Sequence, residues 1–172
     1  MKIGTFTEGN WFGKVKGNTD KVLEQNMRTD LAWWWALDAT HHPIPTIPSV
    51  DDNTYDIGFL ILPKNHINHL YKLDLVGELR KKCKKIAFMQ EGPSWYFQDY
   101  SLEEQVWFYN VLVDVDVIFA HNEMDMRYYK GLTNKKHIYQ NKSLMIESKI
   151  PSSTKPEDRN GVIIGGNFCK WY

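Results

Sequence analysis

Four clusters of polar residues follow short apolar runs in this chain, and their side chains could do chemistry. The clusters are Thr7-Glu8-Gly9-Asn10, Pro63-Lys64-Asn65-His66, Gln90-Glu91-Gly92-Pro93 and His121-Asn122-Glu123. Carboxylate and imidazole groups can take a proton from a hydroxyl, and amides can hydrogen-bond a polyhydroxylated ligand. The clusters therefore predict a binding site for a polar ligand that also contains candidates for a general base.

Each cluster also has a purely structural interpretation. Glu8-Gly9 could be a solvated turn, and Glu91-Gly92-Pro93 could serve only as turn residues. Asn122 precedes a helical pattern and is a preferred N-cap, a role that is compatible with ligand contact. His66 and His69 could share a face, but no carboxylate or cysteine accompanies them, so we predict no metal site.

The common nucleotide and nucleophile motifs are absent from the sequence. There is no G-x-G-x-x-G, no G-x-x-x-x-G-K-[ST] and no G-x-S-x-G. The first loop has two glycines, but their spacing differs from that of a dinucleotide cradle. We therefore expect no bound cofactor.

The elements that must position these clusters alternate between strand and helix. Apolar runs predict strands near residues 2–6, 56–62, 85–90 and 116–120, and helical patterns cover residues 21–39, 73–82, 101–113 and 123–131. Because the strands are continuously apolar, both faces of the sheet should be covered. This predicts an α/β fold, a Rossmann-like three-layer sandwich with a mostly parallel sheet. The carboxyl ends of its strands would meet at one edge, where such folds bind ligands.

Two weaker segments complete the predicted sheet. Residues 41–50 contain three prolines and should be extended, at most as an irregular edge strand. His41 and His42 are expected in a loop. One of the segments 136–139 and 143–146 should form a last strand.

The composition excludes some classes of function. The chain has 172 residues, with 21 Lys and Arg against 21 Asp and Glu, which argues against a nucleic-acid partner. The basic run Arg80-Lys-Lys-Cys-Lys-Lys85 reads as the solvated end of a helix. Cys83 and Cys169 lie far apart, as expected for a reduced, cytoplasmic chain. No stretch has the pattern of a signal peptide or the apolar length of a membrane span.

The domain organisation follows from a change in composition. Residues 1–150 form the Rossmann-like N-terminal domain, and the polar residues 151–160 form a linker. Residues 161–172 contain a strand-like run with a glycine turn, which we interpret as the first strand of a truncated C-terminal domain. An apolar strand without its own domain predicts self-association.

Taken together, the chain resembles the N-terminal domain of a GT-B-fold glycosyltransferase. The segment Lys2-Ile-Gly-Thr-Phe-Thr-Glu-Gly9 is similar to the opening strand and acceptor-side loop of that family. Asp116-Val-Ile-Phe-Ala-His-Asn122 resembles its last strong N-domain strand. Val162-Ile-Ile-Gly-Gly-Asn167 resembles the first strand of the C-terminal domain, whose turn Gly165-Gly166-Asn167 faces the interdomain cleft. The chain departs from the pattern in its proline-rich segment and its tryptophan content.

The resemblance implies transfer of a sugar from a nucleotide-sugar donor to the hydroxyl of a glycan or small-molecule acceptor. The donor would be held mainly by the second domain, so this chain alone would be inactive, and no metal ion is usually required. In an inverting enzyme the base would be Glu91, Glu8 or His121, in that order; in a retaining enzyme these residues would only position the acceptor. The other implied acceptor contacts are Gly9, Asn10, His66, Gln90, Gly92, Asn122 and Glu123, with Gly165, Gly166 and Asn167 on the far side of the cleft.

Two other functions remain open at this point. The chain could be a non-catalytic α/β module that binds glycans or nucleotides. It could also belong to an unrelated two-domain Rossmann-like enzyme, such as a sugar epimerase.

Overall fold

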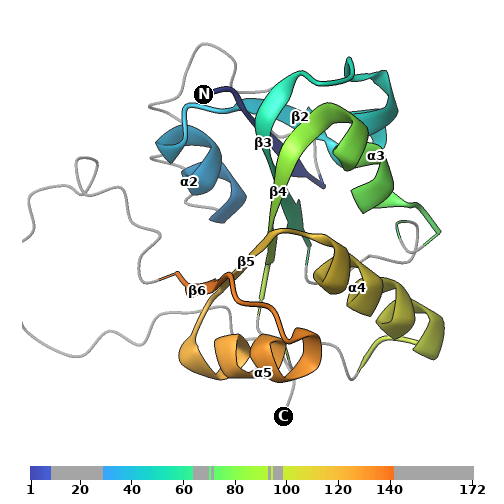
Figure 1. The fold of residues 1–172 in the computed structure, drawn as a ribbon, viewed down its shortest axis with the longest axis vertical. Coiled ribbons are helices and arrows are strands. Elements are labelled where there is room, and N and C mark those ends of the chain that lie inside the picture. The colour runs from blue at the N-terminus through green and yellow to red at the C-terminus, as the bar shows by residue number, and fades with distance from the viewer. Residues whose placement is uncertain (9–28, 64–69, 71, 93, 95–98, 142–172) are drawn as a thin grey trace, which may run out of the picture.

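The described residues form a parallel six-stranded sheet with helices on both faces (Figure 1). A computed structural model describes residues 1–8, 29–63, 70, 72–92, 94 and 99–141. The elements in chain order are β1 (Ile3–Thr7), α2 (Thr29–Ala36), β2 (Thr40–Pro43), the 3-10 helix η2 (Ile44–Ser49), β3 (Tyr55–Leu62), α3 (Leu75–Lys82), β4 (Cys83–Gln90), α4 (Leu102–Asp114), β5 (Val117–Ala120), α5 (Glu123–Thr133) and β6 (Ile138–Gln140). The predicted Rossmann-like three-layer sandwich is confirmed.

The order of the strands across the sheet is β2-β1-β3-β4-β5-β6, and every neighbouring pair is parallel. The chain therefore moves from β1 to β2 in one direction, crosses back, and then adds β3 to β6 in the other direction. This reversal lies between β1 and β3. In open α/β sheets such a switch point is where the loops diverge and leave a crevice for ligands.

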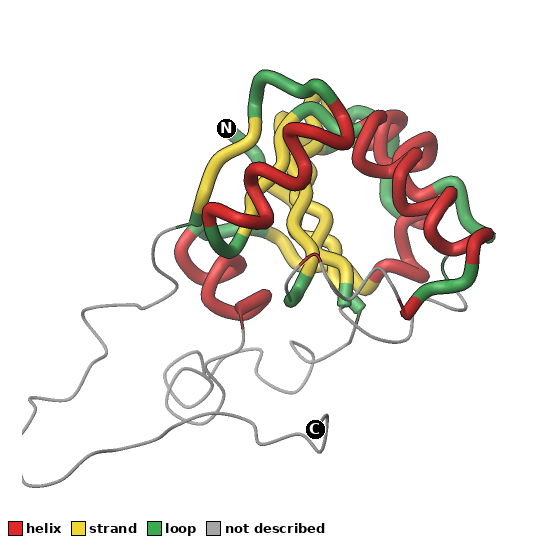
Figure 2. The backbone as a smooth tube through the Cα atoms, turned by 90° about the horizontal axis from the view of Figure 1, so that it is seen from below, coloured by secondary structure: helices red, strands yellow, loops and turns green. Residues whose placement is uncertain are grey.

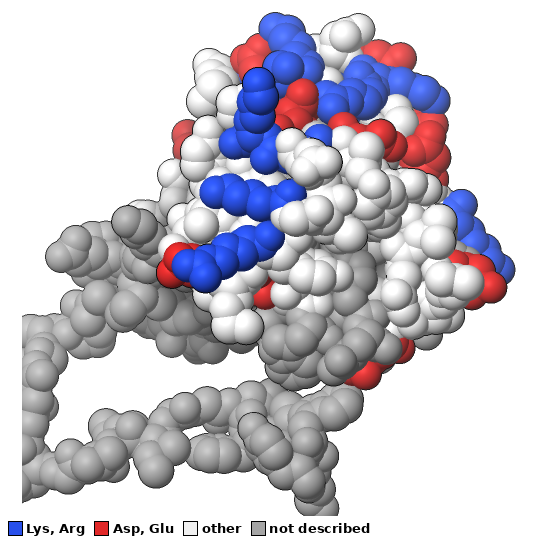
Figure 3. Space-filling view, turned by 60° about the horizontal axis from the view of Figure 1, so that its bottom comes forward, with Lys and Arg blue, Asp and Glu red and all other residues white. Residues whose placement is uncertain are grey.

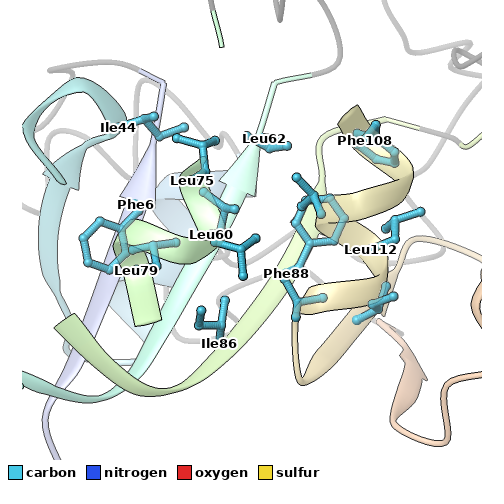
Figure 4. Close-up of a cluster of buried hydrophobic side chains, with 14 of the residues drawn as sticks. Phe6, Ile44, Leu60, Leu62, Leu75, Leu79, Ile86, Phe88, Phe108 and Leu112 are labelled. Atoms are coloured by element: carbon cyan, nitrogen blue, oxygen red, sulfur yellow. The ribbon is translucent and has the colours of Figure 1, made fainter. Parts of the chain in front are cut away.

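The larger half of the core lies between the sheet and the helices α3, α4 and α5. Its buried side chains include Phe6, Leu60, Leu62, Leu79, Ile86, Phe88, Phe108, Leu112 and Tyr129 (Figure 4). Phe88 and Phe108 meet edge to face with ring centroids 5.6 Å apart. Because large aromatic and branched side chains dominate this layer, it should contribute most of the apolar burial.

A smaller cluster lies on the opposite face, under α2. Phe59, Ile61, Ala87 and Met89 are buried there, and Trp33 of α2 packs edge to face on Phe59 at 5.0 Å. Helices thus cover both faces, and Figure 2 shows them around the layer of strands. Buried side chains on both faces explain why β3 and β4 are continuously apolar.

Polar side chains cap the N-termini of helices α3 and α4. Asp74 accepts a hydrogen bond from Gly77 N at 2.9 Å and caps α3. Ser101 and Glu104 form a capping box at the start of α4, with both reciprocal bonds present. These local signals explain why the starts of the helices could be read from sequence.

The structure corrects three expectations about the first third of the chain. Residues 44–49 form a 3-10 helix, so only the first part of the proline-rich segment is extended. His41 and His42 lie in the edge strand β2 and not in a loop. The helix expected to reach residue 39 ends at Ala36, because Asp38 has a left-handed φ of 47°.

The basic run is shared between the last turn of α3 and the start of β4. Each cation has an acidic partner: the pairs are Arg80–Asp116, Lys81–Glu78, Lys82–Asp52, Lys84–Asp56 and Lys85–Asp116. Such pairing lowers the local excess of positive charge, which favours a structural role for the run. Among the described residues, no helix is long and apolar enough to cross a membrane.

Candidate functional site

The carboxyl edge of the sheet carries the described part of the predicted site. Glu8 follows β1, Glu91 and Gly92 follow β4, and His121 follows β5. Since β1, β3, β4 and β5 are consecutive in the sheet, these groups lie along one edge. The other predicted contacts Gly9, Asn10, His66, Gly165, Gly166 and Asn167 fall outside the described residues, as do the predicted linker and second-domain strand.

Glu8 and Glu91 flank the end of β3, beside the switch point. Strands in a sheet are about 4.8 Å apart, so the ends of β1 and β4 lie roughly 10 Å apart across β3. The backbone N–H of Glu91 donates to Leu62 O at 2.7 Å, which ties the end of β4 to the end of β3. Two carboxylate residues therefore border the position where this fold leaves room for a ligand.

Gly92 completes the turn that places Glu91. Its φ of 112° lies in the region that only glycine adopts without strain, so any side chain there would disturb the turn. The side chain of Glu91 is half-buried, and its backbone N–H already has a partner. Glu91 can therefore be part of the turn through its backbone and still act as a general base through its side chain.

His121 holds the same turn from the neighbouring strand. Its Nε2 lies 2.8 Å from Gln90 O and 3.2 Å from Gly92 N. One tautomer donates from Nε2 to the carbonyl, and the other accepts at Nε2 from the Gly92 N–H. In both tautomers the imidazole joins β5 to the β4 turn, so His121 positions Glu91 and Gly92.

The side chain of Gln90 faces the core and not the edge. It is 1% exposed, its Nε2 donates to Tyr100 Oη at 3.1 Å, and Tyr129 Oη donates to its Oε1 at 3.3 Å. Burial raises the pKa of Tyr100 to about 12 and also raises that of Tyr129, so both hydroxyls stay protonated. Gln90 therefore links β4, the following loop and α5, and its amide is already occupied.

Asn122 caps α5, in agreement with its structural interpretation. Its Oδ1 accepts from Asp125 N at 2.9 Å, and its Nδ2 donates to Asp125 Oδ2 at 2.8 Å. The other carboxylate oxygen of Asp125, Oδ1, accepts a hydrogen bond from Ser94 N at 2.8 Å. Asp125 is only 3% exposed, so these hydrogen bonds take the place of water around its carboxylate. Glu123 points elsewhere, since it pairs with Arg127 at 2.6 Å.

Asp125 and Tyr129 are the residues at this edge that sequence reasoning missed. Both lie on α5: Asp125 accepts from Ser94 in the loop after β4, and Tyr129 donates to Gln90 at the end of β4, 31 and 39 residues earlier in the chain. The available signal in the sequence was an acidic residue three positions after Asn122, the candidate N-cap. The contact with Ser94 could not be predicted, because it depends on how α5 docks on the sheet.

A second polar group lies at the β1–β2 edge. Thr7 Oγ1 and His41 Nε2 are 2.9 Å apart, and His42 Nε2 lies 2.6 Å from Tyr55 Oη. Burial, and then the neighbouring His42, lower the pKa of His41 to about 3; burial also lowers the pKa of His42. Both imidazoles are therefore neutral at pH 7, and these contacts hold β2 to β1 and β3.

Two cavities of about 320 Å³ each lie away from this edge. One is on the α2 face and is walled by apolar side chains that include Ile3, Trp33, Ile57 and Phe119. The other lies between α3 and α4, beside Leu73, Trp107 and Asn110. In the described ranges, no three His, Cys, Asp or Glu side chains are grouped so that they could hold a metal ion.

Comparisons of the chain with protein-family models, with curated proteins and with solved structures found no match.

Proposed function

We propose that this chain is the acceptor-side domain of a cytoplasmic GT-B-type glycosyltransferase, which moves a sugar from a nucleotide-sugar to an acceptor hydroxyl. The observation that supports this most is the position of Glu8 and Glu91 on either side of β3, at the switch point of a parallel sheet. The two substrates, a nucleotide-sugar and an acceptor with a hydroxyl group, are inferred from the sequence resemblance. The nucleotide-sugar is held mainly by a second domain.

Glu91 is the preferred base for the inverting form of the reaction. The acceptor hydroxyl gives its proton to the Glu91 carboxylate while its oxygen attacks the anomeric carbon. The bond from that carbon to the nucleotide breaks, and the nucleoside diphosphate leaves with the electron pair. His121 acts through the turn, because its contacts to Gln90 O and Gly92 N hold Glu91 in place.

The retaining form needs no such base, and then Glu8 and Glu91 only position the acceptor.

Binding of acceptors tests the location of the site. Amide chemical shifts of the chain are followed by NMR while mono- and oligosaccharides are added, with nucleotide-sugars as a separate series. We expect saccharides to shift Glu8, Glu91 and Gly92, and the shifts to weaken in Glu8→Gln. Shifts confined to the α2 face, or no response at the carboxyl edge to any saccharide, would contradict the proposal.

Kinetics test the role of Glu91 once the chain is joined to a donor-binding domain. In an inverting enzyme Glu91→Gln should lower kcat about 10²-fold or more with donor affinity unchanged, since a general base typically contributes roughly 10²–10⁴-fold. Glu123→Gln is the matched control, because Glu123 is exposed and paired with Arg127. Turnover of Glu91→Gln within a few-fold of the parent would remove Glu91 as the base.

A further inference from the structure

Helix α4 is apolar on the side that faces away from the sheet. Its core side chains Phe108, Val111 and Leu112 are buried as expected for a helix that covers a sheet. Four further apolar side chains, Leu102, Val106, Tyr109 and Val113, are 40% to 73% exposed. Their spacing of four, three and four residues places them in one row along the helix. We name these four residues the α4 stripe.

Helix α5 carries a shorter row of the same kind. Met124 is 80% exposed and Tyr128 is 43% exposed, four residues apart. Gly131 continues the row three residues later, and a methyl group built there would meet no atom within 4 Å. A glycine at such a position lets a neighbouring helix approach closely. We name Met124, Tyr128 and Gly131 the α5 stripe.

The two helices are neighbours on the same face of the sheet. Both contribute to the larger core cluster, through Phe108 and Leu112 of α4 and Tyr129 of α5. The stripes therefore occupy the outer surface of one helical layer. Figure 3, in which the part of the molecule that carries α5 comes forward, shows uncharged side chains bordered by charged groups of both signs.

The net charges beside the two stripes are opposite in sign, although Glu123 lies among the basic residues of α5. Helix α4 contains no Lys or Arg, and Glu103 and Asp114 are exposed on it. Helix α5 has Arg127 and Lys130 exposed, with Glu123 paired to Arg127 at 2.6 Å. An α4 stripe that packed on another α4 stripe would bring acidic flanks together. Packing of an α4 stripe on an α5 stripe brings acidic and basic flanks together instead.

We propose that two copies of this chain associate through this layer, with the α4 stripe of one copy on the α5 stripe of the other. A two-fold axis allows both contacts at once, because each copy offers the same two stripes. The spacing of the rows suits packing of helices with side chains interleaved. The outward row of apolar side chains on α4 loses its contact with water when the second copy covers it.

The size of the helical layer determines how tightly the two copies are expected to bind each other. Helices of 13 and 11 residues are about 20 Å and 16 Å long, and two adjacent helices span roughly 20 Å in width. Such a face is smaller than the roughly 800 Å² per partner of a typical stable interface. The dimer should therefore be reversible, with a dissociation constant in the micromolar range.

Sedimentation of the full chain over about 1 to 200 µM tests the proposal. We expect a monomer–dimer equilibrium, and Tyr109→Glu should raise the dissociation constant at least tenfold, the change that corresponds to roughly 1.4 kcal/mol. Tyr139→Glu on β6 is the matched control, since Tyr139 is similarly exposed but lies outside the layer. A monomer at every concentration, or a dimer that Tyr139→Glu weakens as much as Tyr109→Glu does, would overturn the proposal.

Cross-linking tests which stripes meet. Tyr109→Cys and Tyr128→Cys are prepared separately in a Cys169→Ser background, where the remaining Cys83 is buried. We expect oxidation to link the two variants when they are mixed, more than it links either variant to itself. Linkage of Tyr109→Cys to itself with none in the mixture would show that the α4 stripes pair with each other and would overturn the proposed pairing.

Discussion

His41 and His42 are adjacent in β2, and their side chains point to opposite faces of the sheet. His41 contacts Thr7, and His42 stacks on Phe6 with ring centroids 5.3 Å apart. Because prolines follow them, His41 and His42 have the sequence pattern of a loop and not that of a strand. Their partners lie 34 and 36 residues earlier in the chain, so the packing role emerges only when β1 and β2 pair.

His41 should make the fold sensitive to acid. The pKa of His41 falls from 6.5 to about 3 on folding, so between these values the unfolded chain binds more protons and stability falls as pH falls. The slope for one group is at most about 1.4 kcal/mol per pH unit. His41→Asn should therefore give a shallower loss of unfolding free energy between pH 6.5 and pH 4, measured by urea titration. An unchanged slope would contradict the prediction, and His137→Asn, at an exposed position, is the control.

At the scale of elements, strands and helix starts were the most predictable features. The strands β3, β4 and β5 are apolar enough to be predicted from their own sequences. The start of α4 is predicted by Ser101 and Glu104, whose spacing of three residues is typical of a capping box. β2 was predicted only in part, as an extended segment that could be an irregular edge strand, and His41 and His42 were wrongly expected in a loop because Thr-His-His-Pro is not apolar. Its side chains are instead satisfied by Thr7, Phe6 and Tyr55 from other strands.

The candidate site could be predicted only in outline. The topology of a parallel sheet brings Glu8, Glu91 and His121 to one edge, and that much follows from the order of the elements. The hydrogen bonds that decide each role join residues about 30 positions apart, as in the contacts of His121 with Gln90 and of Asp125 with Ser94. Sequence patterns carry no information on such contacts between helix and loop.

The pairing of β1 with its neighbours depends on a glycine. A Cβ atom at Gly4 would lie 2.9 Å from Tyr55 Cδ2, because the Tyr55 ring crosses β1 to reach His42. Gly4→Ala should therefore lower the unfolding free energy by about 1–3 kcal/mol, the typical cost of overpacking. The measurement is urea denaturation followed by circular dichroism.

A double-mutant cycle separates this clash from a general effect of alanine in β1. In a Tyr55→Leu background the ring is gone, so Gly4→Ala should cost much less than it does in the parent chain. Equal costs in both backgrounds would show that contact with Tyr55 is not the cause.

At the scale of the whole molecule, the proposed function assigns the acceptor to this chain and the nucleotide-sugar donor mainly to a second domain. The carboxyl edge offers carboxylates and a positioned imidazole to an acceptor, but the described residues include no glycine-rich phosphate cradle at the end of β1. The arginine and lysines of the α3–β4 run are paired with acids and are therefore poorly suited to hold a diphosphate. The proposed function therefore assigns binding of the nucleotide part to a second domain.

We therefore predict that the purified 172-residue chain transfers no sugar and binds nucleotide-sugars weakly or not at all. The physical reason is that a nucleotide-sugar makes most of its contacts through its phosphates and base, and the proposed function assigns these contacts to a second domain. Release of nucleoside diphosphate is measured with a panel of donors and acceptors, and calorimetry reports donor binding. A chain joined to a donor-binding domain is the positive control. Sustained turnover by the 172-residue chain alone would place the donor site within these residues and would contradict the proposed division of the reaction between two domains.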